Sequence, residues 1–172
     1  MDKRLMDSKD INLKISNYNE LFSYFDARNY NNRSLSYDLL SELRRAARDK
    51  KENFKLVINV DKRDKKSEKI IGKRMSDHFK RHYLMLRHER NMHIKNGLLL
   101  TILGIIFMIF ATFVLFYSDE KTFVNGLLVI ILEPAGWFLF WEGLYLVIFD
   151  AKNSTPDLGF YKKMSKCKIV FV

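Results

Sequence analysis

Two stretches of the chain decide its fold class: Leu98–Tyr117 reads LLLTILGIIFMIFATFVLFY, and Leu127–Phe149 reads LLVIILEPAGWFLFWEGLYLVIF. A helix needs about 20 apolar residues to cross the hydrocarbon core of a bilayer, and each stretch is long enough. The first stretch carries no charge and is apolar on every face, which is rare for a helix in a soluble core. We therefore expect two transmembrane helices that form a hairpin.

Charge around these stretches predicts the orientation of the hairpin. The chain has 30 Lys and Arg against 20 Asp and Glu, a net charge of +10. Much of the excess lies in residues 73–95 and 152–168, beside the two stretches, whereas the link 118–126 holds two acids and one Lys. Lys and Arg are retained on the cytoplasmic side during insertion. This predicts a multi-pass protein of the cell (inner or plasma) membrane with both termini cytoplasmic, and the bilayer explains the basic excess without nucleic acid.

Two acids lie within the second stretch, at Glu133 and Glu142. An ionised carboxylate in hydrocarbon costs at least ~2.5–3.5 kcal/mol, so each must be protonated, paired, or turned toward protein or water. Nine residues separate them, which places them about half a turn out of phase on an unbroken helix. Two hypotheses stay open: a carboxylate ring that selects cations in an oligomer, and a protonated Glu bonded across a helix pair.

The same stretch carries residues that shape helix packing. Pro134 removes a backbone donor and predicts a kink. Gly136 and Gly143 allow another helix to approach closely. Trp137 and Trp141 are four residues apart, so they share a face and are expected to pack against a partner helix or to donate to a Glu. Together with the intramembrane acids, these residues predict a homo-oligomer.

Alternating hydrophobicity predicts three strands outside the membrane, over Ile11–Ile15, Phe54–Val60 and Lys168–Val172. If the last strand joins the sheet, the end of the chain returns to its beginning, so both lie on one side of the membrane. A helix is expected from Ser34 or Ser36 to Lys50, with Leu35, Leu39, Leu43 and Ala47 on its apolar face. No proline interrupts residues 65–132, so a second helix could run straight into the first span.

The expected fold class is an α+β membrane protein: a two-helix transmembrane hairpin with a small cytosolic α/β domain, and a first span continuous with a long cytosolic helix. The expected segments follow in chain order. They are a cytosolic α/β domain (1–63), a long basic helix (64–96), the first span (97–117), a short external loop (118–126), the second span (127–149), and a cytosolic tail with a C-terminal strand (150–172).

Four histidines fall between residues 78 and 93. His78 and His82 are spaced i,i+4, which puts two imidazoles on one helical face and can chelate a metal. That face also carries Met75 and Phe79, so the competing interpretation is packing. No carboxylate or Cys completes a ligand set at a usual spacing, and we therefore expect no metal site.

Basic residues on the same helix are candidates for binding anionic lipid headgroups. The alternative is ordinary charge that sets the membrane topology, and this alternative is favoured. The candidate residues are Lys80, Arg81, Arg87 and Arg90.

The order of these segments resembles a family of uncharacterised prokaryotic membrane proteins with two spans. The shared pattern is a strand (54–58), a charged helix with an aromatic and basic stretch (78–83), and a second span that contains Gly136-Trp137-Phe138-Leu139-Phe140-Trp141-Glu142 and ends at Asp150. The likeness covers about residues 20–165. Related second spans often carry a further acid soon after the second Trp, where Tyr145 stands here. The resemblance implies the two-span topology and no activity.

A second resemblance is to the mitochondrial calcium uniporter, whose second span carries the signature Trp-Asp-x-x-Glu-Pro. Glu133 and Pro134 match its last two residues, whereas Val129 and Ile130 stand in place of the Trp and Asp. This likeness implies a cation pore with Glu133 lining the path. Without the first acid, a filter of two carboxylate rings is not available.

No spacing of Ser, His and Asp suggests a catalytic triad, and no Gly-rich phosphate loop occurs. We therefore expect neither an enzyme nor a cofactor. The favoured hypothesis is a non-enzymatic, homo-oligomeric, membrane-anchored binding or scaffold module that presents its soluble domain to a cytosolic protein. The alternative is a cation-conducting oligomeric pore with Glu133 lining the path. The sequence identifies neither the partner nor the stoichiometry.

Overall fold

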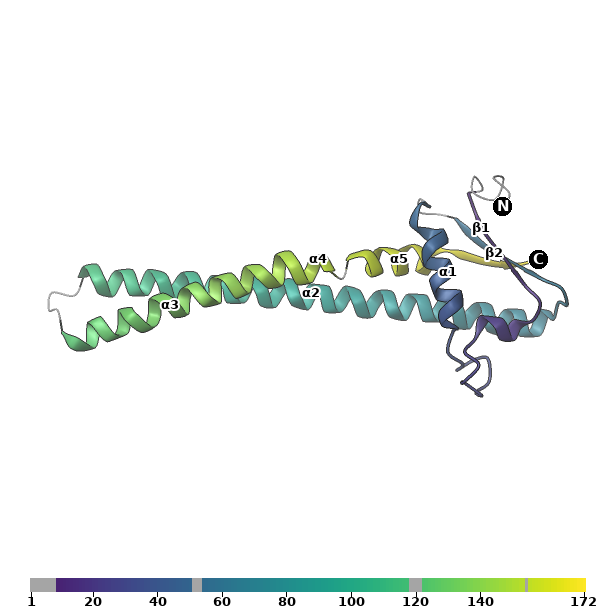
Figure 1. The fold of residues 1–172 in the computed structure, drawn as a ribbon, viewed down its shortest axis with the longest axis horizontal. Helices are drawn as coiled ribbons and strands as arrows, with labels where there is room; N and C mark the ends of the chain where they lie inside the picture. Colours follow the sequence, from purple (N-terminus) through teal and green to yellow (C-terminus); the bar gives the residue numbers. More distant parts are fainter. Residues whose placement is uncertain (1–8, 51–53, 118–121, 154) are drawn as a thin grey trace. The chain divides into compact units, whose positions relative to one another are not determined.

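A computed structural model describes residues 9–50, 54–117, 122–153 and 155–172. The protein is mostly helical, with one three-stranded sheet and two helices long and apolar enough to cross a membrane. It divides into two compact units. The first holds the chain up to Met85 together with Asp157–Val172, and the second holds Leu86–Pro156. Helix α2 (Lys65–Tyr117) begins in the first unit and ends in the second (Figure 1).

All three predicted strands are confirmed, as β1 (Ile11–Ile15), β2 (Lys55–Val60) and β3 (Lys168–Phe171). They form one parallel sheet in the order β1-β2-β3. The pairing continues past β3, because the Val172 N–H donates to the Ile58 carbonyl at 2.9 Å. The last strand therefore does join the sheet, although more than a hundred residues separate it from β2.

The register places most apolar residues of the three strands on one face, and Val57 and Val170 on the other. The paired rows of the first face are Ile11, Leu56 and Ile169, and then Leu13, Ile58 and Phe171; Ile11, Leu56 and Ile58 are buried and the other three are half-buried. Polar residues such as Asn12 and Lys14 alternate with them and are exposed. Right-handed crossovers between parallel strands in sequential order put their helices on the same face of the sheet. The core of the first unit is therefore one-sided.

Three helices supply the other half of this core. Helix α1 (Tyr37–Arg48) has Ser36 as its N-cap, whose hydroxyl accepts from the Leu39 N–H at 3.0 Å. Three residues of the predicted apolar face lie on α1, whereas Leu35, which is also buried, precedes the helix. The buried residues are Leu39, Leu43 and Ala47 of α1, Ile71, Met75 and Phe79 of α2, and Leu158, Tyr161 and Met164 of α5.

Helix α5 (Thr155–Lys166) is a correction, since the sequence suggested only a tail before the last strand. Its Lys163 ammonium donates to three carbonyls at the C-terminal end of α1, those of Ala47, Arg48 and Lys50, at 3.0, 3.2 and 2.6 Å. A cation favours a helix C-terminus because the last carbonyls have no partner within the helix. The helix was missed because its partners lie far away in the sequence.

The second unit contains the end of α2, helix α3 (Phe123–Tyr145), a π-helical turn η3 (Leu146–Asp150) and the short α4 (Ala151–Asn153). Helix α3 begins four residues before the apolar stretch, so part of the predicted 118–126 loop is helical. The rest of that loop, residues 118–121, lies outside the described residues. Helix α3 continues through Pro134, where the kink stays a prediction, and the π-helical turn η3 follows it.

Glycines bring α2 and α3 into backbone contact within this unit. A Cβ at Gly104 would lie 2.6 Å from the Gly136 carbonyl oxygen, and one at Gly97 would lie 2.7 Å from that of Gly143. The two glycines of each helix are seven residues apart, which is about two turns, so they share a face. The helix that lies against Gly136 and Gly143 is α2 of the same chain.

Gly104→Val tests this contact. The valine side chain would meet backbone atoms of Gly136 and Phe140, which cannot rotate away. We therefore expect the free energy of unfolding to fall by about 1–3 kcal/mol. The measurement is thermal unfolding of the full chain in detergent, followed by tryptophan fluorescence. Gly126→Val is the matched control, because a Cβ there meets nothing within 4 Å. Equal melting temperatures for the two variants would contradict the close packing.

Candidate functional site

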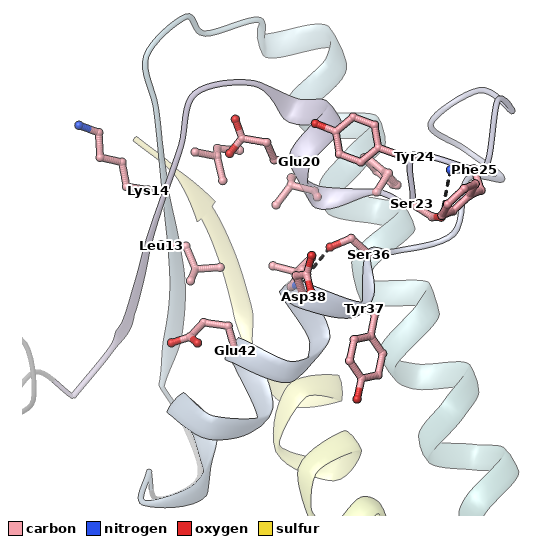
Figure 2. A pocket seen from close by; sticks show the side chains of 14 residues that line it. Leu13, Lys14, Glu20, Ser23, Tyr24, Phe25, Ser36, Tyr37, Asp38 and Glu42 are labelled. Carbon is pink, nitrogen blue, oxygen red and sulfur yellow. Dashed lines mark hydrogen bonds between the residues drawn. The ribbon is translucent and has the colours of Figure 1, made fainter.

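A hollow in the first unit opens beside β1, which is an edge strand of the sheet. It encloses about 530 Å³ and is lined by β1, the 3-10 helix η2 (Tyr18–Leu21), the loop after η2, and the first turns of α1. In Figure 2, Leu13 of β1 points into the hollow, whereas Lys14 points away from it. Backbone groups on the open edge of a sheet are available to pair with an added strand.

Three carboxyl groups border this hollow: Glu20, Asp38 and Glu42. Glu20 accepts from the Asn17 N–H at 3.2 Å, and Glu42 has an exposed contact with Arg45 at 3.5 Å. Lys14 is the one basic residue among the described lining residues. The hollow is therefore acidic, although the chain as a whole carries a charge of +10.

Three aromatic side chains also line the hollow and are almost wholly exposed. The exposed fractions are 82% for Tyr24, 101% for Phe25 and 84% for Tyr37. Exposed aromatic residues clustered beside a groove are typical of protein interaction surfaces, because they contribute large contact areas at low entropic cost. We name the hollow and its rim of three acids and three aromatics the acidic groove.

The loop that carries Tyr24 and Phe25 is held at both ends. Phe22 and Leu35 form an antiparallel bridge, and the Ser23 N–H donates to the Ser34 carbonyl at 2.9 Å. Inside the loop, the Asp26 carboxylate accepts from Arg28 at 2.8 Å and from the Ser34 N–H at 2.7 Å. These bonds, chiefly the one from Arg28, hold the pKa of Asp26 well below its usual range. The aromatic rim therefore stands on a defined loop.

None of the residues of the acidic groove was a candidate at the level of the sequence. They come from three segments, and no local spacing joins them. The one usable signal was the adjacent pair Tyr24-Phe25 in a polar segment without a helical or strand pattern. The groove places three carboxyl groups beside three exposed aromatic rings.

The predicted intramembrane acids lie in the second unit, and the structure does not bring them together. Glu133 and Glu142 are both exposed on α3, and neither pairs with any described residue of the chain. Gly143 packs on Gly97 and Thr101, so Glu142 is level with the start of the first apolar stretch. Gly136 packs on Gly104 and Met108, so Glu133 is level with the middle of that stretch. The two acids thus differ in depth by about 13 Å along the helix.

Trp137 and Trp141 share a face of α3, as predicted, with ring centroids 5.9 Å apart. Their exposed fractions are 52% and 56%. Neither indole N–H donates to another described residue. Just before the first apolar stretch and just after the second, His93 Nδ1 lies 3.9 Å from Asp150 Oδ2.

His78 and His82 pack against α5. The centroids of their two imidazole rings are 4.3 Å apart. Tyr161 stacks on His82 at 5.1 Å, and Phe79 lies edge-on to His78 at 5.6 Å. His78 Nε2 is buried without a hydrogen-bond partner in the described part of the chain. Burial, then the nearby His82, Arg74 and Arg81, lowers the pKa of His78 to about 4. Burial likewise lowers the pKa of His82. Within the described ranges, no group of three or more His, Cys, Asp or Glu could hold a metal ion.

The candidate headgroup residues lie along α2. Lys80, Arg81 and Arg87 are exposed and Arg90 is half-buried. No acid in the described part of the chain pairs with any of the four. Their side chains are therefore available to solvent or to anionic groups.

No protein-family model, curated protein or solved structure matches this chain. The two resemblances drawn from the sequence stay predictions.

The histidine pair predicts a pH dependence. The unfolded chain binds a proton at His78 near pH 6.5, whereas the folded chain binds it only near pH 4. Because the folded-state pKa is depressed, the stabilisation is complete above about pH 6.5 and is lost as the pH falls toward 4. We expect amide protection of α5 to fall by at least about tenfold over this range, measured by hydrogen exchange and corrected for intrinsic rates.

His78→Phe should flatten this pH dependence, because the ring still packs but cannot take up a proton. His88→Phe is the matched control, since His88 is exposed on the same helix. An unchanged pH profile in His78→Phe would assign the effect to other groups.

Proposed function

We propose that this chain is a non-enzymatic, two-span integral membrane protein that displays a cytosolic binding module through its first unit. The two apolar helices would form a hairpin in the cell membrane, and both termini would lie in the cytoplasm. The module is expected to work as a homo-oligomer, with the acidic groove as its binding site.

The closure of the sheet supports this topology. β1 and β2 precede the two apolar helices and β3 follows them, yet all three strands pair in one sheet. A sheet cannot form across a bilayer, so the chain must cross the membrane an even number of times between β2 and β3. Two apolar helices satisfy that condition, and one alone would not. The basic residues on α2 and after α3 then indicate the cytoplasmic side.

Cysteine labelling tests the topology. In a Cys167→Ala background, Thr122→Cys should react with a membrane-impermeant maleimide in intact cells, because Thr122 lies between the two spans. Tyr24→Cys should react only after permeabilisation, because Tyr24 belongs to the first unit. Labelling of Tyr24→Cys in intact cells would place the module outside the cell. If both variants are labelled equally and neither is recovered in the membrane fraction, the hairpin is excluded.

The acidic groove favours one ligand class, a basic extended polypeptide segment. The aromatic rim offers contact area to the alternate side chains of such a segment. Glu20, Asp38 and Glu42 would attract Lys and Arg on such a segment and repel acidic ones. This ligand class fits a cytosolic protein partner.

A defined peptide tests the groove. The full chain in nanodiscs should bind a fluorescent peptide of alternating Lys and Val, and should not bind one of alternating Glu and Val. Glu20→Gln with Glu42→Gln should weaken binding about tenfold, because two rim contacts with charged groups are lost. Fluorescence anisotropy at two salt concentrations measures both effects.

Asp61→Asn is the control for this charge removal, since Asp61 is exposed and does not line the groove. Equal binding of the two peptides, or equal loss in the control, would show that the groove does not select a basic segment.

The second candidate function is a cation-conducting pore lined by Glu133. The observation that favours it is the unpaired Glu133 level with the middle of the first apolar stretch. A pore needs a ring of four or more copies around a water-filled path, since fewer spans cannot enclose one. Subunit counting therefore separates this candidate from a membrane anchor.

A further inference from the structure

The side of α3 that faces away from α2 carries exposed apolar residues and an acid. Gly136 and Gly143 are buried against α2, so the opposite and flanking sides of α3 face away from the hairpin. Ile130, Trp137 and Trp141 are exposed by 70%, 52% and 56%. Glu133 stands one turn from Trp137 on the same side. We name Ile130, Glu133, Pro134, Trp137 and Trp141 the Glu133 face.

This face has the spacing of a helix–helix seam. Ile130, Pro134, Trp137 and Trp141 follow one another at intervals of four, three and four residues. Such a repeat is typical of helices that pack at a small left-handed angle, in membranes as in coiled coils. The hairpin itself does not use the seam, because its own contact runs through the glycines.

Glu133 makes a lipid-facing position unfavourable. Glu142 is level with the start of the first apolar stretch, where a long side chain can extend to the interface. Glu133 is about 13 Å deeper and has no such route. Its carboxyl group therefore needs a partner, and no described residue of its own chain supplies one.

We infer that a second copy of this chain covers the Glu133 face, in a parallel two-fold contact. This inference rests on the proposed membrane insertion. Copies inserted in the same orientation bring their Glu133 residues to the same depth, where two carboxyl groups can share a proton and bond to each other. The Trp137 indole N–H lies one turn away and offers a donor to Glu133 of the second copy. The face is thus self-complementary, which an isologous contact requires.

Cysteine cross-linking of the full chain in native membranes tests the contact. In a Cys167→Ala background, Ile130→Cys should form a disulfide-linked dimer on mild oxidation. Ile131→Cys should not, although it is the next residue and is 57% exposed, because it points about 100° away around the helix. Equal cross-linking at both positions would overturn the assigned face.

Native mass spectrometry from nanodiscs provides a second measurement. The wild-type chain should be a dimer, Glu133→Gln should stay dimeric because an amide still donates and accepts, and Glu133→Leu should dissociate about tenfold more readily. Glu142→Leu is the matched control and should stay dimeric. A wild-type monomer would overturn the inference, and so would a ring of four or more, which would favour the pore.

Vesicle flotation of the same samples separates this inference from the proposed function. Chains that float with vesicles but remain monomeric overturn the Glu133 contact and leave the membrane anchor intact. Chains that do not float overturn both.

Discussion

The parallel pairing of β3 with β2 is the constraint on which the first unit depends. Parallel neighbours cannot be joined by a tight turn, so a long crossover must connect them. In this protein, that crossover contains both apolar helices. The pairing also brings α5 against the C-terminal end of α1, where the Lys163 ammonium donates to the carbonyls of Ala47 and Lys50. Without β3, the sheet would lose an edge strand and the core would lose α5.

The second unit depends on a different kind of contact. Its helices meet through backbone atoms at four glycines, and larger side chains are directed outward. Close approach of this kind suits a membrane, where burial of apolar surface gives no net drive between helices and packing must supply it. The same arrangement fixes the register of the hairpin. It therefore places Glu142 level with the start of the first apolar stretch and Glu133 level with its middle.

Two surfaces of the described chain are candidates for contact with another molecule. The acidic groove combines three acids and three exposed aromatics in an otherwise basic protein. The Glu133 face combines two exposed indoles with an acid that is level with the middle of the first apolar stretch. In the proposed function, the first would bind a basic segment of a cytosolic protein, and the second would contact another copy of the same hairpin.

The sequence by itself determined the elements whose cause is local. Apolar length identified the two long helices, alternation identified β1, β2 and β3, and the spacing of Leu39, Leu43 and Ala47 identified the buried face of α1. Tertiary structure alone decided what depends on distant contacts. It placed β3 beside β2, made α5 a helix, brought Gly136 against α2, and assembled the acidic groove from three segments. Local pattern records which side of an element is apolar, but the partner of that side is chosen by packing across the whole chain.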